Sequence, residues 1–461
     1  MAANSRLQHV PMLWFDTVLL PQGWARDVRI ETADGKIARL ETGTRPSAGD
    51  ERHTIAVPGL ANVHSHAFQR GMAGLAERRG PAGDNFWTWR EVMYRFLDRM
   101  TPDDVHAIAK LAYVEMLERG FTRVGEFHYL HHDRSGGPYA SIAAMADAIA
   151  SAAGETDIGL TLLPVFYAHG NFGAAPPVAG QRRFLSDRDS FATLFEHCKH
   201  AISGLPDANI GVAPHSLRAV TPSELVQIVA LADGGPVHIH AAEQTKEVED
   251  CLAWSGARPV EWLLDHAGVN ASWTLVHATH VTAREIGRLA ESGAVAGLCP
   301  ITEANLGDGI FPASEFLARR GRFGIGTDSN VEIGAAAELR GLEYSQRLTR
   351  RARNLWPSVP ETSTGRALFE GALAGGAQSL DRLPCGIRAG ASADIVSFDA
   401  DDPTFAGRMG DAVLDSWIFA GGKIDCVWRR GKKVVSGGRH SARPAAEDRY
   451  RGVVLRLLCD A

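Results

Sequence analysis

The sequence predicts an α/β protein in which a (β/α)8 barrel is joined to a small discontinuous β-sandwich built from the N- and C-terminal segments. The middle of the chain alternates short apolar runs with amphipathic helical stretches, and eight of these runs read as strands. Both ends are instead rich in short strands and turns. We therefore expect sandwich segments at residues 1–57 and 385–461, and a barrel over residues 58–384.

The two ends of the chain share a pattern of short strands and turns. Near the N-terminus, "DVRIETADGKIARLE" carries an Asp-Gly hairpin signal between two alternating runs. Near the C-terminus, "ADIVSFDA" and "WIFAGGKIDCVWRRGKKVV" have the same pattern of short strands and turns. Because these β-rich ends flank one long middle, we expect them to pair with each other.

Sequence signals mark where several helices between the predicted barrel strands begin and end. The stretch 101–120 opens with Thr-Pro and stops at a glycine, as a helix does. "TPSELVQIVALADGG" and "TAREIGRLAESGA" each begin with a threonine that a glutamate follows three residues later, which is a capping-box pattern. The eight strands end near "GLANVHSH", "TRVGEFHYL", "GLTLLPVFY", "IGVAPHSLR", "PVHIHAAE", "WTLVHATH", "VAGLCPITE" and "FGIGTDSN".

Composition limits the class of protein. The chain has 461 residues, 45% of them hydrophobic, and a net charge of -6, which gives no reason to expect nucleic acid or an anionic membrane as partner. Its apolar stretches are too short to span a bilayer, and we expect no signal peptide. The six cysteines are scattered without a C-x-x-C pair, which favours reduced thiols and a cytoplasmic location.

Polar side chains are concentrated at the ends of the predicted strands. In a (β/α)8 barrel, the active site forms at the carboxyl ends of the strands. The polar residues at these positions are His64, His66, His128, Tyr129, His215, Arg218, His240, Glu243, His277, Thr302, Glu303, Asn305 and Asp328. This enrichment predicts a functional site at the barrel mouth.

The pair His64 and His66 suggests a metal centre. At strand spacing, both imidazoles point to the same face of the first strand. His240, His277 and Asp328 end the fifth, sixth and eighth strands. Three imidazoles and one carboxylate suit Zn²⁺ with an open position for water, with Fe²⁺ as the alternative. The residues alone leave open whether His277 is a ligand or instead an acid/base and electrostatic stabiliser.

A metal of this kind lowers the pKa of bound water to about 7, so hydrolysis then needs a proton shuttle. Glu243 lies three residues beyond His240, just past the strand end, and is placed for that task. The fourth strand, "IGVAPHSLR", has no lysine of the kind that bridges two metals in binuclear barrel hydrolases. We therefore expect one divalent metal per chain.

The motifs "VHSHAF", "HIHAAE", "LVHATH" and "GTDSN" resemble those of the amidohydrolase superfamily, and "IRAGASADIVSFD" resembles its return into the β-sandwich. The resemblance covers essentially the whole chain. It implies a barrel of the metal-dependent hydrolase type whose metal ligands are His64, His66, His240 and Asp328. It further implies that Glu243, His277 and Asp328 handle protons, as in the mononuclear deaminase-type branch.

A narrower resemblance is to the formiminoglutamate deiminase family, through "NVHSHAFQRGMAGLAE", "DNFWTWREVMYR", "EFHYLHHD", "PHSLRAV" and "CPITEANLGDGIFP". That family hydrolyses the linear amidine N-formimino-L-glutamate to N-formyl-L-glutamate and ammonia in histidine degradation. The resemblance implies substrate-binding roles for Gln69, Arg90, Tyr129, His215 and Arg218. A substrate with two carboxylates needs cationic donors, and Arg218 at a strand end is well placed to bind one.

Other functions remain open at this point. The nearest is another mononuclear deaminase of the superfamily, acting on a base such as guanine, cytosine or adenosine. A non-catalytic binding or assembly protein of the same fold is a remote alternative, because the ligand set is complete. A homodimer is common in the family, so we expect one here.

Overall fold

The computed structural model describes residues 12–81, 83–356 and 361–459, and it contains the predicted barrel of parallel strands. Each of the eight predicted strands is present. They are β5 (Leu60–Ser65), β6 (Phe121–His128), β7 (Gly159–Phe166), β8 (Asn209–Ile210), β10 (Val237–Ala241), β11 (Trp273–His277), β12 (Val295–Leu298) and β13 (Arg322–Ile325). A short β9 (Ala213–Pro214) also pairs with β7.

The barrel closes at two seams. β13 pairs with β5 through Ile325 and Asn62, and single bridges join Val212 to Val237 and Ser216 to His240. Every residue of β6 and β7 is buried, as expected for parallel strands that are covered on both faces. Closure brings the carboxyl ends of all the strands to one rim, which is where the predicted site residues lie.

Helices surround the barrel, and the predicted caps are confirmed. Thr101, Thr221 and Thr282 each accept a hydrogen bond from a backbone N–H of the first helical turn, and each threonine N–H donates in return to the carboxylate of the third helical residue. The longer helices are α1 (Phe86–Leu97), α2 (Pro102–Glu118), α3 (Ala144–Thr156), α4 (Arg188–Ile202), α5 (Pro222–Ala230), α6 (Thr245–Ser255), α7 (Pro259–His266), α8 (Ala283–Ser292), α9 (Pro300–Leu306), α10 (Ala313–Ala318), α11 (Ala335–Arg350), α12 (Thr364–Ser379), α13 (Ala412–Ala420) and α14 (Arg443–Cys459). Short 3-10 turns are η1 (Ala67–Met72), η2 (Ala179–Gln181) and η3 (Pro403–Phe405).

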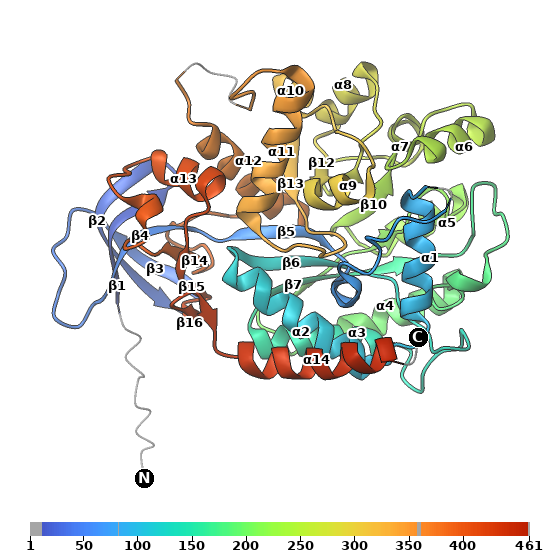
Figure 1. Cartoon of the computed structure of the whole chain (residues 1–461), viewed down its shortest axis with the longest axis horizontal. Helices are drawn as coiled ribbons and strands as arrows, with labels where there is room; N and C mark the ends of the chain where they lie inside the picture. Colours follow the sequence, from blue (N-terminus) through green and yellow to red (C-terminus); the bar gives the residue numbers. More distant parts are fainter. Residues whose placement is uncertain (1–11, 82, 357–360, 460–461) are drawn as a thin grey trace, which may run out of the picture.

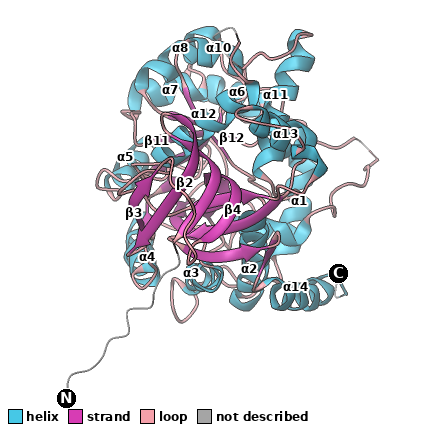
Figure 2. Cartoon of the chain, turned by 90° about the vertical axis from the view of Figure 1, so that its left-hand side faces the viewer, coloured by secondary structure: helices cyan, strands magenta, loops and turns pink. Residues whose placement is uncertain are grey.

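The two ends of the chain pair with each other, as predicted. They form one mixed sheet with the order β17-β16-β15-β14-β4-β1-β2-β3. Its strands are β1 (Leu13–Leu20), β2 (Gly23–Ala33), β3 (Lys36–Glu41), β4 (Glu51–Pro58), β14 (Ile395–Phe398), β15 (Ile424–Arg429), β16 (Lys432–Ser436) and β17 (Arg439–His440). Figure 2 looks onto this sheet, with the barrel behind it.

The terminal strands build one continuous sheet that bends over its own core. A bridge between Lys36 and Ser392 joins the β3 edge to the segment that leads into β14. The side chains of Phe15, Ile30 and Trp428 belong to the apolar cluster that this sheet encloses. The predicted hairpin is present at Asp34 and Gly35, both of which have positive φ.

The last helix leaves the small sheet and returns to the barrel. α14 packs along α2, and Ala446 joins Leu111 and Val114 in a small apolar cluster (Figure 1). Arg443 forms an ion pair with Glu118 at 2.7 Å. This helix was not anticipated from the sequence, where residues 385–461 read only as part of a sandwich.

Candidate metal and catalytic site

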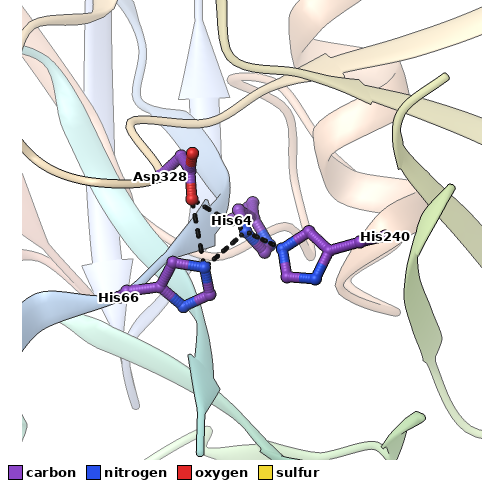
Figure 3. A group of neighbouring side chains, drawn as sticks. All are labelled: His64, His66, His240 and Asp328. Carbon is purple, nitrogen blue, oxygen red and sulfur yellow. Dashed lines mark hydrogen bonds and ion pairs between the residues drawn. The ribbon is translucent and has the colours of Figure 1, made fainter. Parts of the chain in front are cut away.

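Four side chains converge at the barrel mouth (Figure 3). The His64 Nε2 lies 3.1 Å from the Nε2 atoms of both His66 and His240. The Asp328 Oδ1 lies 3.2 Å from the His64 Nε2 and 3.0 Å from the His66 Nε2. Ligand atoms that bind one zinc tetrahedrally at ~2.0–2.1 Å stand roughly 3.3 Å apart, so the spacing fits a single ion.

The strand ends hold these four residues in place. His64 is on β5 and His66 directly follows it, whereas His240 is on β10. The Asp328 N–H donates to the His64 carbonyl at 2.9 Å, and the His66 N–H donates to the Asp328 carbonyl at 2.9 Å. Asp328 has a φ of 42°, in the left-handed region. Such backbone strain costs roughly 1–3 kcal/mol and is typical of functional sites.

Hydrogen bonds to the backbone orient two of the imidazoles. The His66 Nδ1 lies 2.9 Å from the Phe127 carbonyl, and the His240 Nδ1 lies 3.0 Å from the His215 carbonyl. Donation at Nδ1 leaves the Nε2 lone pairs facing the centre of the cluster, as metal binding requires. The donor set therefore fits a divalent metal. All four side chains are buried.

The electrostatics of the cluster also favour a cation. Burial lowers the pKa of the His64 imidazole to about 3, with His66 adding to the shift, so the ring is neutral at neutral pH. Burial opposes ionisation of Asp328, yet its hydrogen bonds with His64 and His66 hold the pKa of that carboxyl well below its usual range. Neutral imidazoles around one carboxylate are the state that a divalent metal needs.

His277 stands beside the four-residue cluster and is not a member of it. Its Nδ1 lies 3.2 Å from a Glu303 oxygen, and its Nε2 lies 3.8 Å from Glu243. Burial lowers the pKa of the His277 imidazole, but Glu243, Glu303 and Asp328 outweigh burial and raise it. The geometry therefore separates His277 from the ligands, which the sequence alone left open.

Glu243 lines the cavity beside the four-residue metal-binding group. Its backbone N–H donates to Glu247 at 3.1 Å, which anchors the turn after β10. Burial raises the pKa of the Glu243 carboxyl to about 7, although His277 and Arg218 oppose the shift. A carboxyl with a pKa near neutrality can both accept and release a proton, as a shuttle must.

All five predicted substrate-binding residues line one cavity together with the catalytic candidates. The cavity includes about 550 Å³ of space that opens to solvent. It is lined by His66, Gln69, Phe86, Trp89, Arg90, Met93, Tyr94, Tyr129, Tyr167, Phe184, His215, Arg218, His240, Glu243, His277, Leu306 and Asp328. The structure thus brings Gln69 and Arg218, which are 149 positions apart in the sequence, into one cavity.

Helix α1 forms one wall of this cavity. Phe86, Trp89, Arg90, Met93 and Tyr94 follow helical i, i+3, i+4 spacing, and all five face the cavity. Asn85 caps the helix by accepting from the N–H of its first turn. The i, i+3, i+4 spacing of these residues is the sequence signal of this helix, which the motif "DNFWTWREVMYR" alone does not reveal.

Two cavity arginines form no ion pair or hydrogen bond with a carboxylate among the described residues, although, against the effect of burial, Glu247 and Glu243 lie near enough to raise the pKa of Arg218. The Arg218 guanidinium is buried and lies over the rings of Phe86 and Trp87, at 5.9 and 5.6 Å from their centroids. The Arg90 guanidinium lies 4.6 Å from the Trp87 ring centroid. In both, the buried Nε has no hydrogen-bond partner in the described structure. Each guanidinium is therefore available to an anion.

The other predicted binding residues also present polar groups. The Gln69 Nε2 donates to the Tyr129 hydroxyl at 2.7 Å, and the buried Gln69 Oε1 has no partner among the described residues. His215 lies between Tyr167 and His240, with ring centroids 4.6 and 4.9 Å away. Burial lowers the pKa of its imidazole well below the usual range, so the ring is neutral.

Glu303 is a site residue to which the sequence analysis gave no role. It is buried on α9, where it accepts from the Cys299 N–H at 2.9 Å and contacts His277. It was recognised only as one of many polar residues after a strand. The contact with His277 could not be inferred from sequence because the two residues belong to different βα units.

Comparison with known families matches residues 55–434 to the amidohydrolase family. The chain therefore belongs to the amidohydrolase family. Residues 16–54 match the model described as "Formimidoylglutamate deiminase HutF, N-terminal domain". Together the two models span both the small sheet and the barrel.

Individual relatives narrow the assignment. Formimidoylglutamate deiminase of Pseudomonas aeruginosa is 46% identical over 450 residues, which are 97% of this chain and 98% of that protein. Within the amidohydrolases, this chain is thus a member of the formimidoylglutamate deiminases, which confirms the resemblance seen in its motifs.

Solved structures agree on the fold. The crystal structure of an amidohydrolase from Brucella melitensis is 56% identical, with a TM-score of 0.95 over 97% of this chain and all of that one. An adenosine deaminase from Xanthomonas campestris with bound zinc has a TM-score of 0.79, covering 97% of this chain and 98% of that one. At 22% identity, the second likeness shows the fold alone.

Proposed function

We propose that this protein hydrolyses N-formimino-L-glutamate to N-formyl-L-glutamate and ammonia, a step of L-histidine degradation. One observation carries the proposal: Arg90 and Arg218 line the same cavity as the metal-binding group, and neither forms an ion pair with a carboxylate among the described residues. The substrate brings two carboxylates, and each guanidinium suits one of them. The family membership supports the same substrate.

The four-residue group would hold one divalent metal, with Zn²⁺ the best match to three imidazoles and a carboxylate. When bound, such an ion polarises the substrate and lowers the pKa of a water to about 7. Among this chain's own residues, Asp328 is placed to accept the proton of the attacking water. Glu243 is placed to carry a proton to the nitrogen that leaves as ammonia.

His277 and the cavity wall complete the proposed reaction. His277 is held by Glu303, and its cationic form would stabilise negative charge that develops as water attacks the formimino carbon. Binding of both carboxylates fixes that carbon near the attacking water, and such positioning supplies a large part of an enzyme's rate. Gln69, Tyr129 and His215 would complete the polar wall.

The decisive experiment is a comparison of substrates. Ammonia release is measured from N-formimino-L-glutamate, guanine, cytosine and adenosine with purified protein whose metal content is known. Release from the formimino acid alone is the expected result, with N-formyl-L-glutamate as the second product. Release from a ring substrate alone would instead identify a nucleobase or nucleoside deaminase.

The location and the oligomeric state of the protein complete the proposal. In the described part of the chain, no helix is long and apolar enough to cross a membrane. All six cysteines are free, which supports the proposed reducing, cytoplasmic location. We also propose a homodimer, which sedimentation of the purified protein would test.

A further inference from the structure

Among the described residues, a second group of metal-ligand side chains lies on the small sheet. His53 is on β4, and Asp425 and Cys426 are on β15, the strands on either side of β14 (Figure 1). Their ligand atoms all lie within 4.8 Å of one another. The proposed reaction uses none of these residues.

A β-bulge explains how two consecutive residues join one site. Val396 pairs with Val427 and Phe398 pairs with Ile424, so β15 has one residue more than β14 between these points. The extra residue falls at Asp425 and Cys426, where the side chains need not alternate between faces. Bulges of this kind commonly re-aim a side chain toward a site.

The distances bring a sulfur, an oxygen and a nitrogen together. The Asp425 Oδ2 lies 3.3 Å from the Cys426 Sγ and 3.5 Å from the His53 Nδ1. These separations are close to those of the ligand atoms at the barrel mouth. Thiolate, imidazole and carboxylate are the donors that zinc prefers in proteins, and Asp425 is exposed enough to admit a water as fourth ligand.

Glu51 orients the imidazole of His53 through the ring nitrogen that faces away from Asp425 and Cys426. The His53 Nε2 lies 2.7 Å from a Glu51 oxygen, so donation there leaves the Nδ1 lone pair facing Asp425 and Cys426. A carboxylate behind a histidine is the arrangement that orients metal-bound imidazoles. In the absence of a metal, a proton on the His53 Nδ1 takes the place of the ion facing the Asp425 carboxylate.

The charges of the group also match a divalent ion. Glu51, Asp425 and a Cys426 thiolate contribute three negative charges, and Lys433, which pairs with Glu51, contributes one positive charge. The remaining two negative charges equal the charge of one divalent cation. Binding requires the Cys426 thiol to release its proton to solvent.

We propose that His53, Asp425 and Cys426 bind a second divalent metal of the zinc type, separate from the catalytic site. The ion joins β4 of the N-terminal segment to β15 of the C-terminal segment. It therefore stabilises the sheet in which the two ends of the chain meet, and it takes no part in catalysis.

Cobalt(II) alone is the probe, because a cobalt–thiolate bond absorbs in the near ultraviolet and the four ligands at the barrel mouth include no sulfur. Full-length protein in which the exposed Cys459 is replaced by serine is stripped of metal and titrated with Co²⁺. We expect two cobalt ions per chain, one at each group, with thiolate absorption from one of them.

Two variants and a control complete the test. Cys426→Ser and His53→Gln should each lose one cobalt ion and the thiolate absorption, while keeping the deimination rate. Cys385→Ser removes a half-buried cysteine outside the group and should retain both ions. Should Cys426→Ser fail to fold, His53→Gln decides the question. One ion per chain in the starting protein, or thiolate absorption that survives in these variants, would overturn the proposal.

Discussion

At the residue scale, Glu243 has an environment that differs from that of an ordinary surface glutamate. Burial raises the pKa of its carboxyl to about 7. The positive charges of His277 and Arg218 lower the pKa and so limit this rise. The same burial that would be costly for a structural glutamate suits a proton shuttle. Its neighbour Glu247 secures the turn that presents it.

Replacing Glu243 by glutamine keeps the size of the side chain and removes its proton. We expect kcat for ammonia release to fall by ~10²–10⁴-fold, the usual contribution of a general acid or base. Metal content, measured by elemental analysis, should stay unchanged because Glu243 is outside the ligand group. A variant within tenfold of the parent rate would exclude the shuttle role.

Arg218 provides a second prediction at this scale. Its buried guanidinium faces the cavity without a carboxylate partner among the described residues, so a substrate carboxylate would supply the partner. Arg218→Met should lower kcat/KM by roughly 10–100-fold, since a hydrogen bond to a charged group is worth about 1.5–3 kcal/mol. The effect should appear mainly in KM.

The matched control for Arg218 is Arg284→Met. The Arg284 side chain is 76% exposed on α8 and pairs only loosely with Glu261, at 3.4 Å. Its removal should leave kcat/KM unchanged. Equal losses in both variants would show that charge in general, and not the cavity guanidinium, governs substrate capture.

At the scale of elements, the helix caps are local features that act without help from the rest of the fold. Thr221 begins α5 with a capping box: its hydroxyl accepts from the Glu224 N–H, and Glu224 accepts from the Thr221 N–H at 2.7 Å. The two bonds satisfy backbone donors that the first turn otherwise leaves free.

Thr221→Ala should lower the free energy of unfolding by about 1 kcal/mol, the usual cost of losing a capping hydroxyl. Urea unfolding followed by circular dichroism measures the change. Thr193→Ala, at an exposed position within α4, removes a hydroxyl that donates to the Asp189 carbonyl, which already accepts within the helix, and it should leave the midpoint nearly unchanged. A similar loss in both variants would argue against a capping contribution.

At the scale of the whole molecule, a buried ion-pair network joins the small sheet to the barrel. Arg429 of β15 contacts Asp207 at 2.7 Å and also pairs with Asp394. Arg123 of β6 pairs with the same Asp207. Charges removed from water in this way are costly unless every member keeps its partner.

Arg429→Met removes the charge partner of Asp207 and Asp394, which are only partly exposed, and should destabilise the protein by roughly 3 kcal/mol. Thermal unfolding monitored by circular dichroism provides the measurement. The comparison is Lys432→Met, which breaks an exposed ion pair with Asp157 and should cost at most about 1 kcal/mol. Comparable losses in both variants would contradict the importance of burial.

The same network predicts a pH dependence. Burial raises the pKa of the Asp394 carboxyl, but Arg429 and the Arg430 N–H outweigh it, and the pKa lies below its usual value. Because the folded pKa is the lower one, the stabilisation is fully present above the unfolded pKa of about 3.9. It is lost as pH falls through the folded value. The thermal unfolding midpoint should therefore decrease as the pH falls below about 4. The decrease should be less steep in the Asp394→Asn variant.

The sequence by itself determined the features that depend on near neighbours. Strand and helix alternation, the threonine caps and the Asp34-Gly35 hairpin all follow from local periodicity and local hydrogen bonds, and all are present. The placement of His64 and His66 on one face of a strand also follows from the two-residue repeat of the strand. For this reason, the sequence predicts the fold class and the pairing of His64 with His66, and it places His240 and Asp328 at the ends of other barrel strands.

Only the tertiary structure decided which distant side chains meet. His240 lies 176 positions from His64, yet barrel closure brings their Nε2 atoms within 3.1 Å. The contact of Glu303 with His277, the cavity face of α1 and the return of α14 depend in the same way on packing between elements. The periodicity of the sequence carries no information on such pairs. Their distances depend on the closure of the barrel and the burial of its surface, which no local rule describes.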